Sequence, residues 1–315
     1  MRVAYHPDYC IELPPTHPFP MGKYPGVHRL LLEEGVIDAG DVMRPEPAPR
    51  ALLERVHARE YLDKLETGTL SPAEVRRMGV PWSARLWRRS RLATMGTVLA
   101  ARAALQDGLA GNLAGGTHHA FADRGEGFCV LNDVAIAVRA LQQEGAAGRF
   151  VIVDLDVHQG NGTAAIFESD PDVFTVSVHG ERNYPLAKMR STVDVGLADG
   201  LGDAEYLETL ERVLPDALDR AKAELVFYLA GVDPAAGDRY GKLALTEAGL
   251  RARDRCVAAA CRQRGLPLVL LLAGGYAPTP ERTARLHANT FIEAAAEFGA
   301  ATAPLPERAA RYRPR

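Results

Sequence analysis

Cysteine is scarce in this chain of 315 residues, with four at positions 10, 129, 256 and 261 and no CxxC pair. This spacing excludes a disulfide-rich scaffold and a cysteine-rich zinc site. Long apolar runs are absent too, because no stretch approaches 18 uninterrupted apolar residues, and so no membrane-spanning helix is expected. The N-terminus, MRVAYHPDYC, turns polar after a few residues, unlike a signal peptide. These absences predict a cytoplasmic protein.

A strong excess of charge of one sign is also missing, since 37 basic and 40 acidic residues give a net charge of −3. Such a balance gives no general attraction to nucleic acid or to an anionic membrane, and neither is expected as a partner. Hydrophobic residues at 47% supply a large core. We find no repeat or convincing linker, and therefore predict one domain over 1–315 with an Arg/Pro-rich tail from about 303. Richness in Ala, Arg and Leu suggests a bacterial chain.

What the chain does contain is a regular alternation of apolar runs and helical patterns. Segments with helical spacing lie at 90–108, 132–145, 204–223 and 246–265. Candidate strands are the short apolar runs RVAY (2–5), GNLAGG (111–116), FVIVDLD (150–156), VFTVSVH (173–179), ELVFYLAG (224–231) and LPLVLLLAGG (266–275). Strands that alternate with helices of this length predict βαβ units and a parallel sheet covered on both faces. The fold class is therefore α/β.

Chemically reactive residues follow four of these candidate strands. THHA follows the run at 111–116, VHQGNG the run at 150–156, VDP the run at 224–231, and Tyr276 the run at 266–275. In an open parallel sheet, ligands bind outside the carboxyl ends of the strands. The four strand ends thus predict one functional site at one edge of the sheet.

The stretch VIVDLDVHQGNG (151–162) carries Asp154, Asp156 and His158 at every second position. These side chains share one face if the strand continues through them. Buried carboxylates need a partner, and Asp156 with His158 fits two ligands of a divalent cation, with Asp233 as the third. Three ligands leave a coordination position open, as in catalytic metal sites. The alternative is a salt-bridged or helix-capping Asp pair with a hydrogen-bonded His.

His118 and His119 stand side by side in a Gly-rich loop, GGTHHAFADRGEGF. Two imidazoles in one site are suited to act as base and acid. Asp154 is placed to orient one ring and Asn161 the other, and different partners would separate the two roles. The Tyr276 phenol is placed to donate a hydrogen bond to a developing oxyanion. The alternatives are an ordinary exposed or buried His pair and a plain Gly-Gly-Tyr turn.

Five motifs, in order and spacing, carry a family resemblance. They are GGTHHAFADRGEGFCVLNDVAIA, VDLDVHQGNGTA, VSVH, AGVDPAAGDRYGKLALTEAG and AGGY. The chain resembles the zinc-dependent histone deacetylases, over about residues 2–295. HPFPMGKY near residue 17, RVHAREYL at 55, the HQGN form and AGGYAPTPERTAR look most like the class IV branch and its bacterial relatives. The resemblance implies the arginase/deacetylase fold, a three-layer α/β/α structure with a mostly parallel eight-stranded sheet.

The resemblance also implies roles for individual residues. It assigns Asp156, His158 and Asp233 to zinc. His118 and His119 would form the catalytic pair, and Tyr276 would stabilise the oxyanion. Asp154 and Ser177 would help to hold a structural potassium ion, and Asn161 stands where class I enzymes use Asp. Substrate-binding positions would be Gly127, Phe128, Tyr184 and Tyr240. At the position of Tyr240 the family often has an aliphatic residue. GVPWSARLW (79–87) occupies the region of a substrate-gripping Asp of class I enzymes.

These assignments predict a metal-dependent amidohydrolase that removes acetyl or longer acyl groups from lysine side chains or related amines. A metal-activated water would attack, a His would act as general base, and a Tyr would stabilise the oxyanion. The oxygen-rich ligand set is compatible with Fe²⁺ as well as Zn²⁺. Alternatives are a deacetylase of acetylpolyamines or other small amides, a two-manganese ureohydrolase of the same fold, and a non-catalytic binder of acyl ligands.

Overall fold

A computed structural model of the chain describes residues 1–299 and contains eight strands within them. The tail predicted from about residue 303 lies outside the described residues. The strands are β1 (Arg2–Ala4), β2 (Val42–Met43), β3 (Leu109–Asn112), β4 (Phe150–Asp154), β5 (Val173–Gly180), β6 (Val193–Leu197), β7 (Leu225–Leu229) and β8 (Leu268–Leu271).

All eight strands form one sheet in the order β2-β1-β3-β8-β7-β4-β5-β6, and every neighbouring pair is parallel. The predicted α/β fold with a parallel eight-stranded sheet is confirmed. Each of the six candidate strands has a counterpart. The two strands that the sequence did not reveal, β2 and β6, lie at the edges of the sheet, where a strand is short or only half buried.

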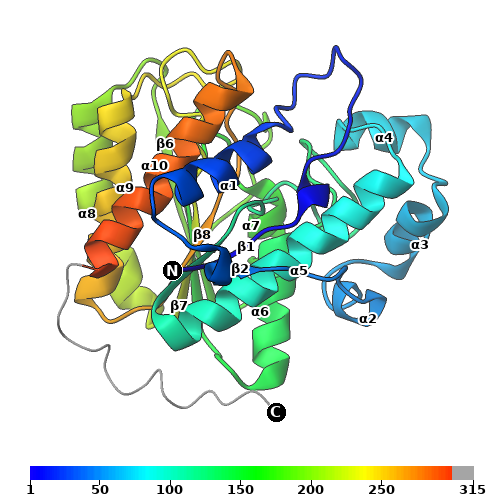
Figure 1. Cartoon of the computed structure of the whole chain (residues 1–315), viewed down its shortest axis with the longest axis horizontal. Coiled ribbons are helices and arrows are strands. Elements are labelled where there is room, and N and C mark those ends of the chain that lie inside the picture. The colour runs from blue at the N-terminus through cyan, green and yellow to red at the C-terminus, as the bar shows by residue number, and fades with distance from the viewer. Residues whose placement is uncertain (300–315) are drawn as a thin grey trace.

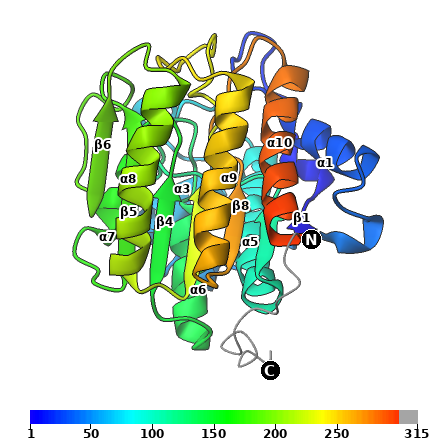
Figure 2. The same cartoon turned by 90° about the vertical axis from the view of Figure 1, so that its left-hand side faces the viewer.

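Ten helices accompany the sheet in the described part of the chain. They are α1 (Lys23–Glu33), α2 (Arg50–Leu53), α3 (Arg59–Thr67), α4 (Pro72–Met78), α5 (Ala84–Asp107), α6 (Asp133–Glu144), α7 (Asn161–Phe167), α8 (Asp203–Ala221), α9 (Glu247–Gln263) and α10 (Pro280–Gly299). Helices α8, α9, α10 and α1 follow one another across one face of the sheet, and α5 and α6 cover the other (Figures 1 and 2). None of these helices has both the length and the apolar character that a bilayer crossing requires.

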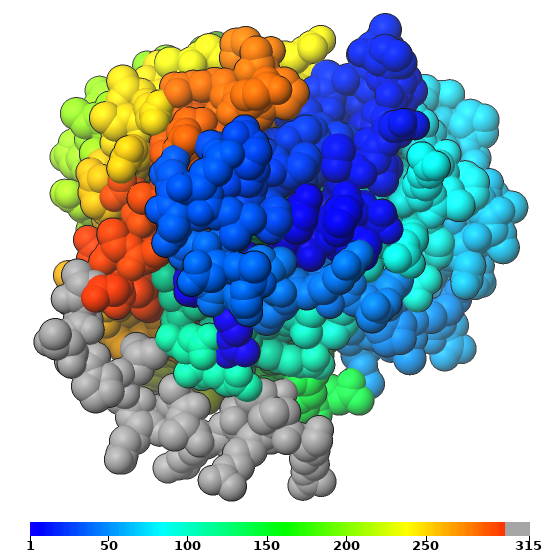
Figure 3. Space-filling model, in the orientation of Figure 1, coloured from blue at the N-terminus to red at the C-terminus, as the bar shows by residue number. Residues whose placement is uncertain are grey.

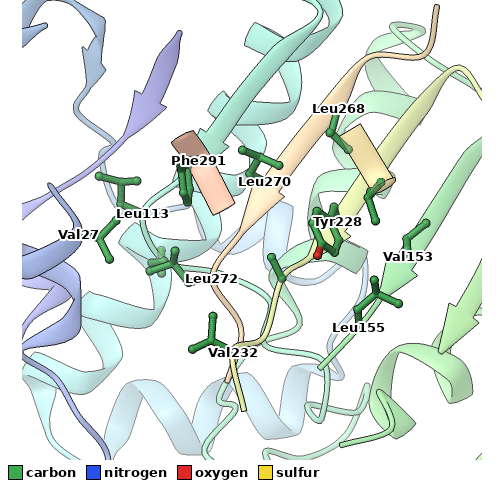
Figure 4. Packing of buried hydrophobic residues seen from close by; sticks show 14 of the residues in the cluster. Val27, Leu113, Val153, Leu155, Tyr228, Val232, Leu268, Leu270, Leu272 and Phe291 are labelled. Carbon is green, nitrogen blue, oxygen red and sulfur yellow. The ribbon is translucent and has the colours of Figure 1, made fainter. Parts of the chain in front are cut away.

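The strand side chains alternate between two hydrophobic cores, one on each face. In β4, Val151 and Val153 join the larger core with residues of α1, α8, α9 and α10, whereas Phe150 and Ile152 join a second core with residues of α5 and α6. Figure 4 shows the larger core, where Val153 lies among side chains of the neighbouring strands. Burial on both faces explains why these strands are continuously apolar rather than alternating.

Some strands end earlier than the sequence predicts. The strand expected over 150–156 stops at Asp154, so the premise that it continues through His158 is wrong. The reason is local hydrogen bonding, since the Asp154 carboxylate accepts the backbone N–H of Asp156 (3.2 Å), and Asp156 in turn accepts the N–H of His158 (2.9 Å). Such side-chain acceptors compete with ladder bonds and turn the chain. The same early ending occurs in β3 and β8.

The N-terminal segment crosses the face formed by the last helix. In the space-filling view its side chains, in blue, adjoin those of α10, in orange and red (Figure 3). Helix α1 packs on α10, which brings the two ends of the described chain together. The parallel strands place the loops after β3, β4, β7 and β8 at one edge of the sheet, and these loops carry the site.

Candidate functional site

Asp156, His158 and Asp233 meet where the loops after β4 and β7 come together. One ligand atom from each lies within 4.8 Å of the other two, and all three side chains are buried. Nδ1 of His158 is 2.9 Å from Oδ1 of Asp156 and 3.2 Å from Oδ2 of Asp233. In residues 1–299 this is the one group of three or more such ligands that is arranged to hold a metal ion. The three residues predicted as ligands are therefore brought together.

The chemistry of this cluster fits a divalent cation. Oδ2 of Asp233 is buried and makes no hydrogen bond. Burial raises the pKa of Asp233, the neighbouring Asp156 carboxylate raises it further, and it reaches about 7. Burial alone would lower the pKa of His158, but the adjacent Asp156 and Asp233 carboxylates raise it to about 10. The cluster thus attracts positive charge, and two carboxylates with one imidazole are a ligand set for Zn²⁺ or Fe²⁺.

A glycine after β8 makes room for the two carboxylates. Gly274 donates its backbone N–H to Oδ2 of Asp156 (2.7 Å). A Cβ at this position would lie 2.1 Å from Oδ2 of Asp233 and 2.6 Å from Oδ2 of Asp156. Only glycine fits here, and this explains the AGG sequence that precedes Tyr276.

The two adjacent histidines have different partners. Nδ1 of His118 lies 2.6 Å from Oδ2 of Asp154, and Nδ1 of His119 lies 2.7 Å from Oδ1 of Asn161. Burial alone would lower the pKa of His118, but the Asp154 and Asp156 carboxylates raise it to about 9. Burial and the neighbouring His118 lower the pKa of His119 well below its usual value. The structure gives each ring the partner expected for it, and the two rings differ in basicity.

Asp154 and Ser177, predicted to help hold potassium, occupy opposite positions of the paired strands β4 and β5. Oγ of Ser177 lies 2.9 Å from Nδ1 of His179, and both residues are buried. One carboxylate oxygen of Asp154 is hydrogen-bonded to Nδ1 of His118, and the other accepts the backbone N–H of Asp156. The two residues are therefore close, and the potassium role stays a prediction.

An outer cavity of about 290 Å³ leads to the cluster. The predicted substrate-binding residues all line it, namely Gly127, Phe128, Tyr184 and Tyr240, together with His119, His158 and Tyr276. Four of its lining residues are Phe or Tyr. Gly127 has a φ of +54°, and a Cβ there would lie 2.5 Å from Cδ2 of His119. A larger residue would therefore clash with the His119 ring.

Tyr276 is held by its backbone and by the rings around it. Its N–H donates to Oδ2 of Asp238 (2.6 Å), and its ring packs edge-on against Tyr240 at 4.9 Å between centroids. Burial and the nearby Asp233 and Asp156 carboxylates raise the pKa of the phenol well above its ordinary value. The hydroxyl therefore keeps its proton and is available as a hydrogen-bond donor.

Two carboxylates that sequence reasoning left without a role contact the site residues. Oε1 of Glu126 accepts hydrogen bonds from Nδ2 of Asn161 (2.9 Å) and from the Tyr184 hydroxyl (2.6 Å). Asp238 accepts the backbone N–H groups of Tyr240, Gly241 and Tyr276. Glu126 lies in the quoted GEGF segment, but a lone acidic residue in a loop gives no signal of such contacts.

The chain is similar to known proteins over most of its length. The model of the histone deacetylase domain matches residues 17–292. An uncharacterised protein of Picosynechococcus sp. is 52% identical over 275 residues, which is 87% of this chain and 92% of that protein. Histone deacetylase 2 of Arabidopsis thaliana is 31% identical over 294 residues, 90% of this chain and 76% of the relative. The crystal structure of the HDA15 HD domain matches the fold with a TM-score of 0.78 at 23% identity, covering 94% of this chain and 90% of that one.

Proposed function

The chain belongs to the histone deacetylase family, and from that premise we propose that it is a metal-dependent hydrolase that removes acetyl or longer acyl groups from lysine side chains or related amines. Family membership makes it a hydrolase of the deacetylase type. The observation that carries the finer proposal is the meeting of Asp156, His158 and Asp233 at the inner end of an aromatic cavity, beside His118 and His119. The placement near class IV enzymes stays a prediction from the motifs.

We propose that Asp156, His158 and Asp233 hold one divalent cation, Zn²⁺ or Fe²⁺. Bound there, the cation would polarise the acyl carbonyl and make the attacking water more acidic. Phe128 and Tyr184 hold the stem of the acylated amine in the outer cavity, so that its carbonyl reaches the inner end. The surrounding rings exclude bulk water, which strengthens every polar interaction with the reacting groups.

His119 is suited to be the general base. Its Nδ1–H donates to the amide oxygen of Asn161, so Nε2 carries the lone pair and is turned away from Asn161. A low pKa keeps this ring neutral before the reaction, as a base must be. Nε2 takes the proton of the attacking water and passes it to the leaving amine. His118, beside the Asp154 carboxylate, is more basic and serves as the second proton carrier.

The alternatives differ in measurable ways. A two-manganese ureohydrolase needs a second ligand group, and residues 1–299 hold one such cluster, with Asp233 followed by Pro234 and Ala235. Metal analysis is expected to find about one ion per chain rather than two. A non-catalytic binder would take up acyl ligands without releasing the amine.

The direct test is hydrolysis of a panel of acyl-lysine peptides and acetylpolyamines by the zinc-loaded and the iron-loaded protein. We expect release of the free amine, abolition by a chelator and recovery when the metal is returned. Binding of these compounds without release of the free amine would indicate a non-catalytic binder of acyl ligands instead.

Glu126 is the subject of a further prediction, because it connects two groups of the site. By accepting from Nδ2 of Asn161 it keeps Oδ1 of that amide facing His119, and it also fixes the Tyr184 hydroxyl. Glu126→Ala is expected to lower kcat/KM about tenfold, as loss of an outer partner of a reacting group does. Glu126→Gln keeps the accepting Oε1 and is expected to restore most of that loss. Steady-state kinetics and melting temperatures of both variants separate this positioning role from simple destabilisation. A lower kcat/KM in Glu126→Ala at an unchanged melting temperature supports positioning, whereas a parallel fall in melting temperature contradicts it.

A further inference from the structure

Two arginines stand at the mouth of the outer cavity. Arg76 and Arg77 occupy the last turn of α4, line the cavity and are exposed to solvent. Within residues 1–299, neither side chain has an ion-pair or hydrogen-bond partner. Many other arginines in this part of the chain, such as Arg50 and Arg264, are paired with carboxylates. The two cations at the mouth are therefore free to meet a ligand.

The backbone fixes these arginines beside the aromatic wall. The carbonyl of Arg77 accepts the N–H of Gly127 (3.3 Å), and the carbonyl of Met78 accepts the N–H of Phe128 (2.8 Å). The helix end is thus joined directly to the strip that lines the cavity. A substrate stem between Phe128 and Tyr184 must emerge next to the two guanidinium groups.

Among residues 1–299, no carboxylate lines the outer cavity beside these two arginines. Acidic side chains close to this region are engaged elsewhere. Glu74, on the same helix as the two arginines, pairs with Lys64 (3.0 Å), Glu126 accepts from Asn161 and Tyr184, and Asp238 accepts three backbone N–H groups. The chain as a whole has a net charge of −3, so the positive mouth is a local feature.

We infer that the substrate carries a carboxylate close to its acylated amine, and that Arg76 and Arg77 bind this carboxylate at the mouth. Guanidinium groups match the planar geometry of a carboxylate and form charge-assisted hydrogen bonds with it. The same charges repel acylated polyamines, whose remaining amines are cationic. The inference rests on the proposed function and narrows its substrate class to anionic acylated amines.

The test compares substrates that differ only in charge. Nε-acetyl-lysine with a blocked α-amine is offered with a free carboxylate and as the carboxamide, next to an acetylated diamine. Acetyl-lysine peptides with an adjacent Asp or Asn show whether a peptide side chain supplies the carboxylate instead. For the wild-type protein we expect kcat/KM to favour the carboxylate over the carboxamide about tenfold, mainly through KM and less at high salt.

Variants then assign the preference to the two arginines. In Arg76→Gln/Arg77→Gln the carboxylate-to-carboxamide ratio is expected to fall to about one, and in Arg76→Glu/Arg77→Glu the acetylated diamine is expected to become the better substrate. Arg212→Gln removes an exposed positive charge from α8, away from the outer cavity, and serves as the control, with the wild-type ratio retained.

The possible failures are distinct. Equal rates on carboxylate and carboxamide in the wild type, or a ratio unchanged in both double variants, overturn the inference while the proposed deacylase activity stands. A metal-loaded wild-type protein that hydrolyses no member of the panel overturns the proposed function and this inference with it.

Discussion

Asp233→Asn is expected to lower both the metal affinity and the deacylase rate by more than about 100-fold. Loss of a group that only hydrogen-bonds to a metal ligand costs up to about 100-fold, and loss of a ligand itself is expected to cost more. The substitution replaces one of the two proposed carboxylate ligands by a neutral amide. It keeps an oxygen at the position of Oδ1, which accepts the backbone N–H of Val157 at 2.9 Å. The loop after β7 is therefore expected to keep its conformation while the ligand set loses a charge.

Metal content per chain and melting temperature with and without metal check this expectation. Ligands that bind the folded state raise its stability by mass action, so added Zn²⁺ is expected to raise the melting temperature of the wild type and not that of the variant. Asp216→Asn, on the exposed side of α8, is the matched control and retains metal and activity. A fully loaded and active Asp233→Asn protein would contradict the proposed ligand set.

The interior of the fold was predictable from the sequence because the central strands are buried on both faces. The sequences around Val153, Phe227 and Leu270 are continuously apolar, as expected for strands buried on both faces. The helices between them have apolar residues at helical spacing. The edge strand Val193–Leu197 escaped prediction because its residues are only partly buried and its pattern, VDVGL, resembles a loop. Its place in the sheet comes from pairing with β5, a long-range contact that local sequence does not encode.

The sequence predicted that the candidate site residues would lie together, but it did not predict their local geometry. Strand ends at one edge of the sheet predicted that Asp156, His158 and Asp233 would meet, and they do. The strand was wrongly extended through Asp156, because competition between carboxylate acceptors and the sheet ladder depends on side-chain conformation. Glu126 was missed for a related reason, since its partners Asn161 and Tyr184 come from distant parts of the chain.

Tyr276→Phe is expected to lower kcat by about 10²–10³-fold with little change in KM or in bound metal. The change removes only a hydroxyl. The ring keeps its contacts with Tyr240, Phe128 and Phe19, and the backbone N–H keeps its bond to Asp238. In the proposed mechanism the phenol donates to negative charge that develops on the acyl oxygen, so its loss is expected to weaken binding of the transition state far more than binding of the substrate.

Single-turnover kinetics together with metal analysis distinguish this loss from that of the ligand variant. Tyr276→Phe is expected to bind a full complement of metal and to turn over slowly, whereas Asp233→Asn loses both. Tyr5→Phe controls for removal of a phenol hydroxyl, because the Tyr5 ring stacks on His28 and does not line the outer cavity. A near-wild-type kcat in Tyr276→Phe would exclude the tyrosine as the oxyanion donor. The charge on the acyl oxygen would then have to be stabilised without it, by the cation proposed to bind Asp156, His158 and Asp233 and by the protonated His118.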